Sequence, residues 1–182
     1  MKPVVLGLKR GAVALAPHDA AWAESAHAVI DALRRILGGD ALDIQHVGST
    51  AVRGIAAKPI VDIAVRVAEI ADMRRHDAAL AASGIMYCKE EHGGQALYCM
   101  GSDEMRTHYI HVVRRDDPAW RNYLLFRDYL NAHEAAARRY SDLKRELMAQ
   151  FPLDREAYTQ GKQPLIQEIL TEARAWERAG RR

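Results

Sequence analysis

The chain has 182 residues, of which 49% are hydrophobic and 27% are charged, and its formal net charge is +2. These proportions are those of an ordinary soluble globular protein, and the length suits one domain with an adequate core over residues 1–182. So small a net charge gives no reason to expect a nucleic-acid partner, and the basic residues do not gather in a block with aromatic residues. The apolar runs near the start are broken by Lys9 and Arg10 and are too short for a membrane span.

Only two cysteines, Cys88 and Cys99, are present, and they do not form a CxxC pair. The spacing therefore indicates neither a zinc site nor a disulfide framework. We expect both thiols to be reduced and packed, and we expect a reducing cytoplasm as the compartment.

Hydrophobic periodicity predicts an extended segment near the start, with Val13–Leu15 as a strand or as the lead-in to one, and then a helix from Asp19 to about Leu37 that Gly38 and Gly39 end. Strands are expected at residues 44–47, 60–67, 85–88, 96–100 and 108–113, with a helix at 69–83 and a charged turn at 89–94. Consecutive strands joined by turns are expected to pair antiparallel.

The chain from about residue 116 onward is predicted to be helical. Helices are expected at about 116–132, 134–150, and from a cap at Asp154 to about 177, the last interrupted near Gly161 and Pro164. The predicted fold class is therefore α+β: a small mixed sheet flanked by helices, with a sheet-containing part at about 1–115 and a helical part at about 116–182.

The stretch from Ile44 to Val67 is the part of the sequence best suited to chemistry. It predicts a strand, a turn at Gly48, Ser49 and Thr50, a loop of small residues and a second strand. Glycine tolerates positive φ and lets a ligand approach the backbone, and the next two residues add hydroxyl and N–H donors of the kind that hold phosphate oxygens. The alternative is an ordinary strand–turn–strand, because the two common phosphate motifs, GxxxxGK[ST] and GxGxxG, are absent.

The segments HVGSTAV and GIAAKPIVDI resemble the signature of the GrpB family, whose proteins share the nucleotidyltransferase fold. The resemblance continues in family order over nearly the whole chain, through HYIHVV, LFRDYL, YSDLKREL and YTQGKQPLIQEIL. It implies a Gly-Ser turn that holds the phosphates of a nucleoside triphosphate and a following strand whose acidic residues hold divalent metal, magnesium or manganese, with zinc as a further candidate.

Asp62 is the single carboxylate on that second strand. Nucleotidyltransferases place two acids there, two positions apart, so that both lie on one face and hold two magnesium ions. This chain has Ile60 at that spacing, and its later strand offers His111 or His108 instead of an acid. We interpret Asp62 as a metal ligand together with His46 and His111; the alternative is a buried carboxylate paired with a neighbouring cation or with one of these histidines.

His108 and His111 are three positions apart, which places them on opposite faces of a regular strand. Both could reach one site only through a bulge, and His111 shares its face with Tyr109.

Five residues of the helical half belong to the family pattern: Arg127, Tyr140, Lys144, Tyr158 and Lys162. Each of the two Tyr–Lys pairs is four residues apart and so lies on one helical face, where the ring could stack a base and the ammonium could hold a phosphate. The alternative is amphipathic packing, with the lysine stems lying over apolar surface.

Two functions remain open on the sequence. The first is nucleotidyl transfer, with Ser49, Lys58 and Asp62 as catalytic residues and Lys144 as a further counter-charge for phosphate; Lys58 could instead neutralise Asp62. The second is a binding or accessory module for a nucleotide or other phosphorylated metabolite, near coenzyme A metabolism because GrpB-like domains also occur joined to dephospho-coenzyme A kinase. Ile60 favours the second.

Overall fold

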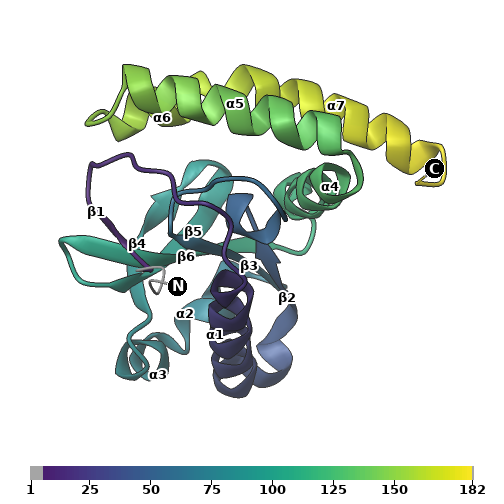
Figure 1. The fold of residues 1–182 in the computed structure, drawn as a ribbon. Coiled ribbons are helices and arrows are strands. Elements are labelled where there is room, and N and C mark those ends of the chain that lie inside the picture. Colours follow the sequence, from purple (N-terminus) through teal and green to yellow (C-terminus); the bar gives the residue numbers. More distant parts are fainter. Residues whose placement is uncertain (1–5, 182) are drawn as a thin grey trace.

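A computed structural model describes residues 6–181 of the chain (Figure 1). The strands are β1 (Leu8–Lys9), β2 (Ala41–Val47), β3 (Val61–Val67), β4 (Met86–Glu91), β5 (Gln95–Gly101) and β6 (Met105–Arg114). The helices are α1 (Ala21–Leu37), α2 (Ile70–Arg74), α3 (Asp77–Ala82), α4 (Pro118–Ala132), α5 (Glu134–Gln150), α6 (Arg155–Gly161) and α7 (Gln163–Arg178). Over these residues, no helix combines the length and apolar character that a membrane crossing requires.

The sheet has the strand order β2-β3-β6-β5-β4, and the short β1 pairs with the start of β6. All neighbouring strands pair antiparallel except β3 and β6, which are parallel with Asp62 opposite Tyr109 and Ala64 opposite His111. The mixed sheet that the sequence predicts is confirmed. The two central strands are the ones that carry Asp62 and His111.

Helices lie on both sides of this sheet, as Figure 1 shows: α1, α2 and α3 on one side, and α5, α6 and α7 across the other. The main apolar core lies between α1 and the sheet, because α1 turns its periodic apolar residues inward and β3 is buried along its length; on α1 these are Trp22, Ala26, Val29, Ile30, Leu33 and Leu37. A second cluster joins the β2–β3 loop to α4, α5 and α7.

Three elements differ from the sequence-based expectations. The segment predicted as one helix at 69–83 forms two, because α2 ends at Arg74 and α3 begins at Asp77. Val13–Leu15 is not a strand; the extended pairing near the start is β1, with an isolated bridge between Ala16 and Ala57. β4 continues to Glu91, through the first half of the predicted charged turn at 89–94.

The two cysteines were expected to be reduced, and the structure instead joins Cys88 to Cys99 in a disulfide. β4 and β5 are neighbours, and the pairing register shifts between Tyr87 and Lys89, where Cys88 lies opposite the region of Cys99. Sequence spacing could not indicate this pair, because the contact depends on the register of a hairpin. The disulfide ties the edge strand that carries Glu91 to the rest of the sheet.

We expect a reducing agent to lower the free energy of unfolding by about 1–3 kcal/mol, because the bond closes a short loop with a sequence separation of 11. Urea denaturation with and without reductant measures this difference. The Cys88→Ser/Cys99→Ser double variant serves as the control and should show no response to reductant. Alkylation of two thiols in the native, unreduced protein would contradict the disulfide.

Candidate functional site

Gly48 ends β2 in a backbone conformation that only glycine adopts readily, with φ 70° and ψ −169°. A Cβ at this position would lie 2.6 Å from Asp62 Oδ2, so the missing side chain also lets the turn approach the carboxylate. The next residue, Ser49, places its Oγ 3.3 Å from the Tyr140 hydroxyl of α5. The turn is therefore packed between β3 and α5.

The imidazole of His111 lies between two carboxylates. Its Nε2 donates to Asp62 Oδ1 at 3.2 Å and its Nδ1 donates to Glu91 Oε2 at 3.3 Å. The three residues come from three strands, β3, β6 and β4, and the His111 ring also lies 5.5 Å from the ring of Tyr123 on α4. Of the two interpretations of Asp62, this geometry matches the carboxylate paired with a histidine.

The charges of this group reinforce one another. Burial alone would lower the pKa of His111, but the hydrogen bonds and charges of Asp62 and Glu91 raise it to about 9. Burial alone would raise the pKa of the Asp62 carboxyl, but His111, with Lys58 and Lys162, holds it below its usual value. The hydrogen bond from His111 likewise lowers the pKa of Glu91. At neutral pH the group is two carboxylates around one imidazolium.

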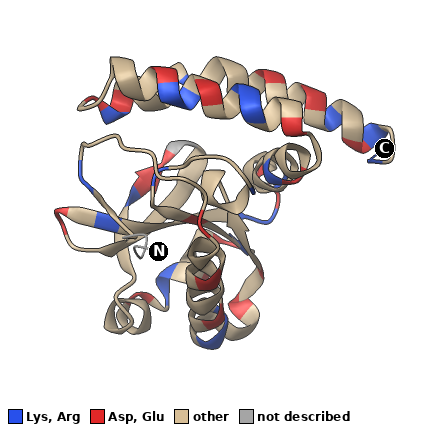
Figure 2. Ribbon diagram, viewed as in Figure 1, with Lys and Arg blue, Asp and Glu red and all other residues tan. Residues whose placement is uncertain are grey.

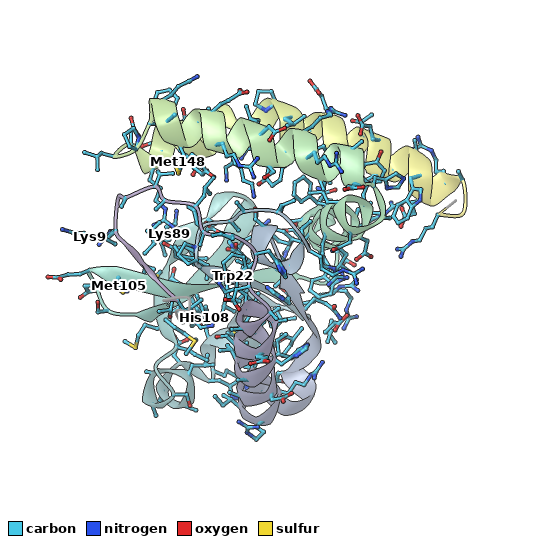
Figure 3. The ribbon with its side chains drawn as sticks, viewed as in Figure 1. Lys9, Trp22, Lys89, Met105, His108 and Met148 are labelled. Atoms are coloured by element: carbon cyan, nitrogen blue, oxygen red, sulfur yellow. A yellow bond between two sulfur atoms is a disulfide. The ribbon has the colours of Figure 1, made fainter. Side chains whose placement is uncertain are left out.

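A cavity of about 560 Å³ lies above this group, within the size range of small-molecule sites. Its floor comes from β3, β4, β5 and β6, and its walls come from the Gly48–Ser49 turn, the β2–β3 loop and helices α4 to α7. Figure 3 places Lys89 of β4 between the sheet and the layer of α5 and α6, which is the level of this cavity. Aromatic side chains line it, namely Tyr109, Tyr123, Phe126, Tyr140 and Tyr158.

Three half-buried cations reach the same cavity: Lys58 from the β2–β3 loop, Arg155 at the start of α6, and Lys162 just after α6. The ammonium groups of Lys58 and Lys162 lie 5.2 and 4.9 Å from the ring centroid of Tyr158, and the guanidinium of Arg155 lies 5.4 Å from that of Tyr109. Burial, with the nearby charges of Lys162 and Arg155, lowers the pKa of Lys58 to about 7, against a smaller opposing effect of Asp62.

Of the predicted site residues, Gly48, Ser49, Lys58, Asp62 and His111 line this cavity. The helical half adds Tyr140, Tyr158 and Lys162. The structure thus brings together two parts of the sequence that are about a hundred residues apart.

Four other predicted residues point elsewhere. Thr50 is buried, and its hydroxyl lies 2.9 Å from His46 Nε2. The two side chains therefore form a hydrogen bond with each other and do not face a ligand. Arg127 donates to Gln45 Oε1 and to the His46 carbonyl, each at 3.0 Å. Lys144 is fully buried and donates to the Ala56 carbonyl.

These four residues were placed at the ligand on the strength of the motif alone. In the structure their hydrogen bonds hold the turn and the loop in place instead. Lys144 was expected to pair with phosphate, but its ammonium instead donates to the Ala56 carbonyl. Burial, followed by the charge of Lys162, lowers the pKa of Lys144 to about 7.

His108 lies on the other face of the sheet, as the odd spacing predicts. Its Nε2 is 2.9 Å from Ser25 Oγ of α1 and its Nδ1 is 3.0 Å from Thr107 Oγ1. Figure 3 shows His108 and Trp22 on the side of α1, away from Lys89. No bulge separates His108 from His111 in the β3–β6 register, so the two histidines serve different sites.

Sequence reasoning missed three charged residues of the cavity, Lys89, Glu91 and Arg155. Glu91 was assigned to a turn, whereas β4 extends far enough to bring it to His111. Arg155 precedes Lys162 by seven residues, two helical turns, and that spacing could have indicated a shared face.

The three predicted metal ligands do not converge on one point as a set. Asp62 and His111 bond to each other, His46 bonds to Thr50, and the described part of the chain contains no group of three or more His, Cys, Asp or Glu side chains placed to hold a metal ion. On the cavity face of β3, the neighbours of Asp62 are Ile60 and Ala64, neither of which can bind metal. The donor set at this position therefore does not fit the paired metal ions of the nucleotidyltransferase fold.

Comparison with known proteins places the chain in a family. The model of the family described as GrpB protein matches residues 12–172. The glutamate-rich protein GrpB of Alkalihalophilus pseudofirmus is 34% identical over 173 residues, which cover 92% of this chain and 99% of that protein. The chain belongs to the GrpB family. A dephospho-CoA kinase of Mycolicibacterium paratuberculosis is 28% identical over 93% of this chain, which matches 47% of the kinase.

Solved structures show the same fold. The crystal structure of GrpB from Enterococcus faecalis has a TM-score of 0.81 and 31% sequence identity, covering 88% of this chain and 96% of that one. A structure of the Cid1 poly(U) polymerase with Mg 3′-dATP bound has a TM-score of 0.52 and 16% identity, covering 81% of this chain and 49% of the polymerase chain. The GrpB-family fold is thus nucleotidyltransferase-like, as the resemblance implied.

We expect Gly48→Ala to destabilise the protein by roughly 3 kcal/mol, because a Cβ would meet the Asp62 carboxylate in a backbone region unsuited to alanine. Gly54→Ala is the matched control. Gly54 lies in the same loop with φ 77° but has no atom within 4 Å of the added Cβ, so only a backbone cost of about 1 kcal/mol remains. Urea denaturation of both variants measures the difference, and equal losses would contradict the close contact.

The raised pKa of His111 predicts a pH-dependent contribution to stability. Its stabilising effect is complete below the unfolded-state pKa of about 6.5 and is lost as the pH rises through about 9. The stability gap between the native chain and His111→Gln should therefore narrow between pH 6 and pH 9.5, by on the order of 2 kcal/mol. Chemical denaturation at the two pH values measures the gap. A gap that stays constant would show that His111 is not charged between Asp62 and Glu91.

Proposed function

We propose that this GrpB-family chain binds a nucleoside triphosphate, or another phosphorylated small molecule, in the cavity between the sheet and helices α4 to α7. The observation that carries the proposal is the convergence of Lys58, Arg155 and Lys162 on that cavity. Within residues 6–181, none of the three forms an ion pair or a side-chain hydrogen bond. Cations left unpaired in a half-buried cavity repel one another, and a phosphorylated ligand would relieve that repulsion.

The aromatic lining suits the remainder of such a ligand. The ammonium groups of Lys58 and Lys162 both lie close to the ring of Tyr158. The rings of Phe126 and Tyr140 pack edge to face, with their centroids 5.1 Å apart. Amide side chains of Asn122 and Gln163 also reach the cavity. Apolar rings with a few polar groups are the usual surroundings of a bound base.

Binding is better supported than nucleotidyl transfer. The fold is shared with the Cid1 polymerase, but a two-metal reaction needs more acids than the single carboxylate on β3. The accessory role expected from the sequence remains the second candidate, because the chain resembles about half of a protein named dephospho-CoA kinase. In that role the ligand would be a phosphorylated metabolite near coenzyme A. Either ligand occurs in the cytoplasm, so that compartment stays part of the proposal, although the Cys88–Cys99 disulfide removes the reduced thiols from which it was first expected.

A nucleic-acid ligand is not part of the proposal. Figure 2 shows Lys and Arg interspersed with Asp and Glu along α5 and α7, and ion pairs such as those from Arg139 to Glu168 and Glu172 join the two helices. Nucleic-acid sites instead present a continuous basic surface.

Calorimetric titration with ATP, GTP, CTP, UTP and dephospho-coenzyme A tests the proposal. We expect at least one of them to bind, and we expect Lys162→Met and Arg155→Met each to weaken that binding about tenfold, the effect of one charge-assisted contact. Arg145→Met is the control, because Arg145 pairs with Asp142 on the exposed face of α5. The proposal fails if neither the four nucleotides nor dephospho-coenzyme A binds, or if the control weakens binding as much as the cavity variants do.

A further inference from the structure

We propose that the cavity holds the phosphate groups of its ligand without a divalent metal ion, with Lys58, Arg155 and Lys162 supplying the positive charge. This inference rests on the proposed function, because it specifies how the same cavity binds phosphate. It concerns the form of the ligand: a free di- or triphosphate anion instead of its magnesium complex.

The first support is the acidic side of the cavity. Two-metal sites need several carboxylates on one face, and the positions two before and two after Asp62 are Ile60 and Ala64, with 3% and 0% exposure. Neither side chain has an oxygen atom that could bind a metal ion. Asp62 is therefore the only acid that β3 turns toward the cavity.

The second support is the way the remaining carboxylates are used. Asp62 and Glu91 both bond to the ring of His111, one to each nitrogen. The ring occupies one oxygen of each acid, Asp62 Oδ1 and Glu91 Oε2, and an imidazolium at that position would repel a metal ion bound beside it. Each of the two acids therefore has a positively charged hydrogen-bond donor beside it that is part of the protein.

The third support is the number and origin of the cavity cations. They come from three separate places: the β2–β3 loop, the first turn of α6 and the residue after α6. Lys58 and Lys162 approach the ring of Tyr158, and Arg155 approaches that of Tyr109. Tyr109 lies beside Asp62 in the β3–β6 register, so these cations surround the carboxylate floor.

These cations can do for a phosphate chain what magnesium does elsewhere. Magnesium neutralises oxygens on neighbouring phosphates, and three side-chain cations provide comparable charge with directional N–H donors. A ligand with two or more phosphates matches three cations better than one phosphate does. Magnesium would occupy the phosphate oxygens that the lysines and the arginine would otherwise contact, so it would compete with the site.

Titration with inorganic triphosphate, and with whichever nucleotide binds, tests the inference in EDTA and again in excess magnesium or manganese. We expect binding in EDTA to be as tight as binding with metal, or tighter. Binding that requires metal, or that metal tightens by more than about tenfold, overturns the inference while leaving the proposed function intact. The absence of binding in every condition overturns both.

Asp62→Asn distinguishes metal-free binding from metal-dependent binding, because the two predict different changes in affinity. If no metal binds, removing a negative charge beside the phosphates should leave affinity unchanged or raise it up to about tenfold. If Asp62 holds a metal, the same change should abolish binding, and that result overturns the inference. Glu91→Gln is the second variant, with the same expectation, in case Asp62→Asn does not fold. Asp142→Asn on the exposed face of α5 is the neutral control, and circular dichroism confirms the fold of each variant.

Discussion

The His111 ring between Asp62 and Glu91 is the interaction on which the site depends. Two carboxylates facing one partly enclosed cavity repel each other and lose hydration, and either effect alone would favour protonation of one of them. The imidazolium reduces both costs, because it donates a hydrogen bond to each acid and places a positive charge between them. Its position is fixed by the fold: β3 and β6 run parallel, and the β4–β5–β6 pairing brings Glu91 within reach from the far side.

The helical half completes the site by supplying the opposite charge. The sheet contributes two acids and a histidine, whereas Arg155 and Lys162 come from α6 and from the residue that follows it. α6 and α7 together therefore do more than cover the sheet. The charges are arranged in two layers: a floor in which His111 lies between the two carboxylates, and a wall of cations that form no ion pair within residues 6–181. This separation supports the proposal of an anionic ligand.

The parts of the site that the sequence predicted are those whose residues are neighbours in the chain. Gly48, Ser49, Lys58 and Asp62 fall within one strand–turn–strand, so the local motif was enough to group them. Predicting that Glu91 reaches the site would have required the register of the β4–β5 hairpin and the exact length of β4, and a local sequence pattern indicates neither. The fold class was predicted from periodicity together with the family resemblance. The disulfide was not, because it depends on the same hairpin register.

The two Tyr–Lys pairs show most clearly what local spacing leaves open. Tyr140–Lys144 and Tyr158–Lys162 have the same separation and the same geometry, with each ammonium 4.7 or 4.9 Å from the centroid of its ring. One lysine lines the cavity and the other is fully buried. The difference lies in which face of each helix docks against the β2–β3 loop, a property of tertiary packing that neither pair reveals by itself.

The buried lysine, Lys144, has a structural role that explains its place in the family sequence pattern. The β2–β3 loop has little regular structure, so its carbonyl groups need partners from elsewhere. Lys144 bonds to the Ala56 carbonyl, Asn131 bonds to the Ala51 carbonyl at 3.0 Å, and Arg127 bonds to the His46 carbonyl just ahead of the turn. α4 and α5 therefore fix the path of the backbone from the end of β2 almost to Lys58. A lysine on a loop held this firmly keeps its ammonium in the cavity with little loss of entropy when a ligand binds, which is the condition for a preorganised anion site.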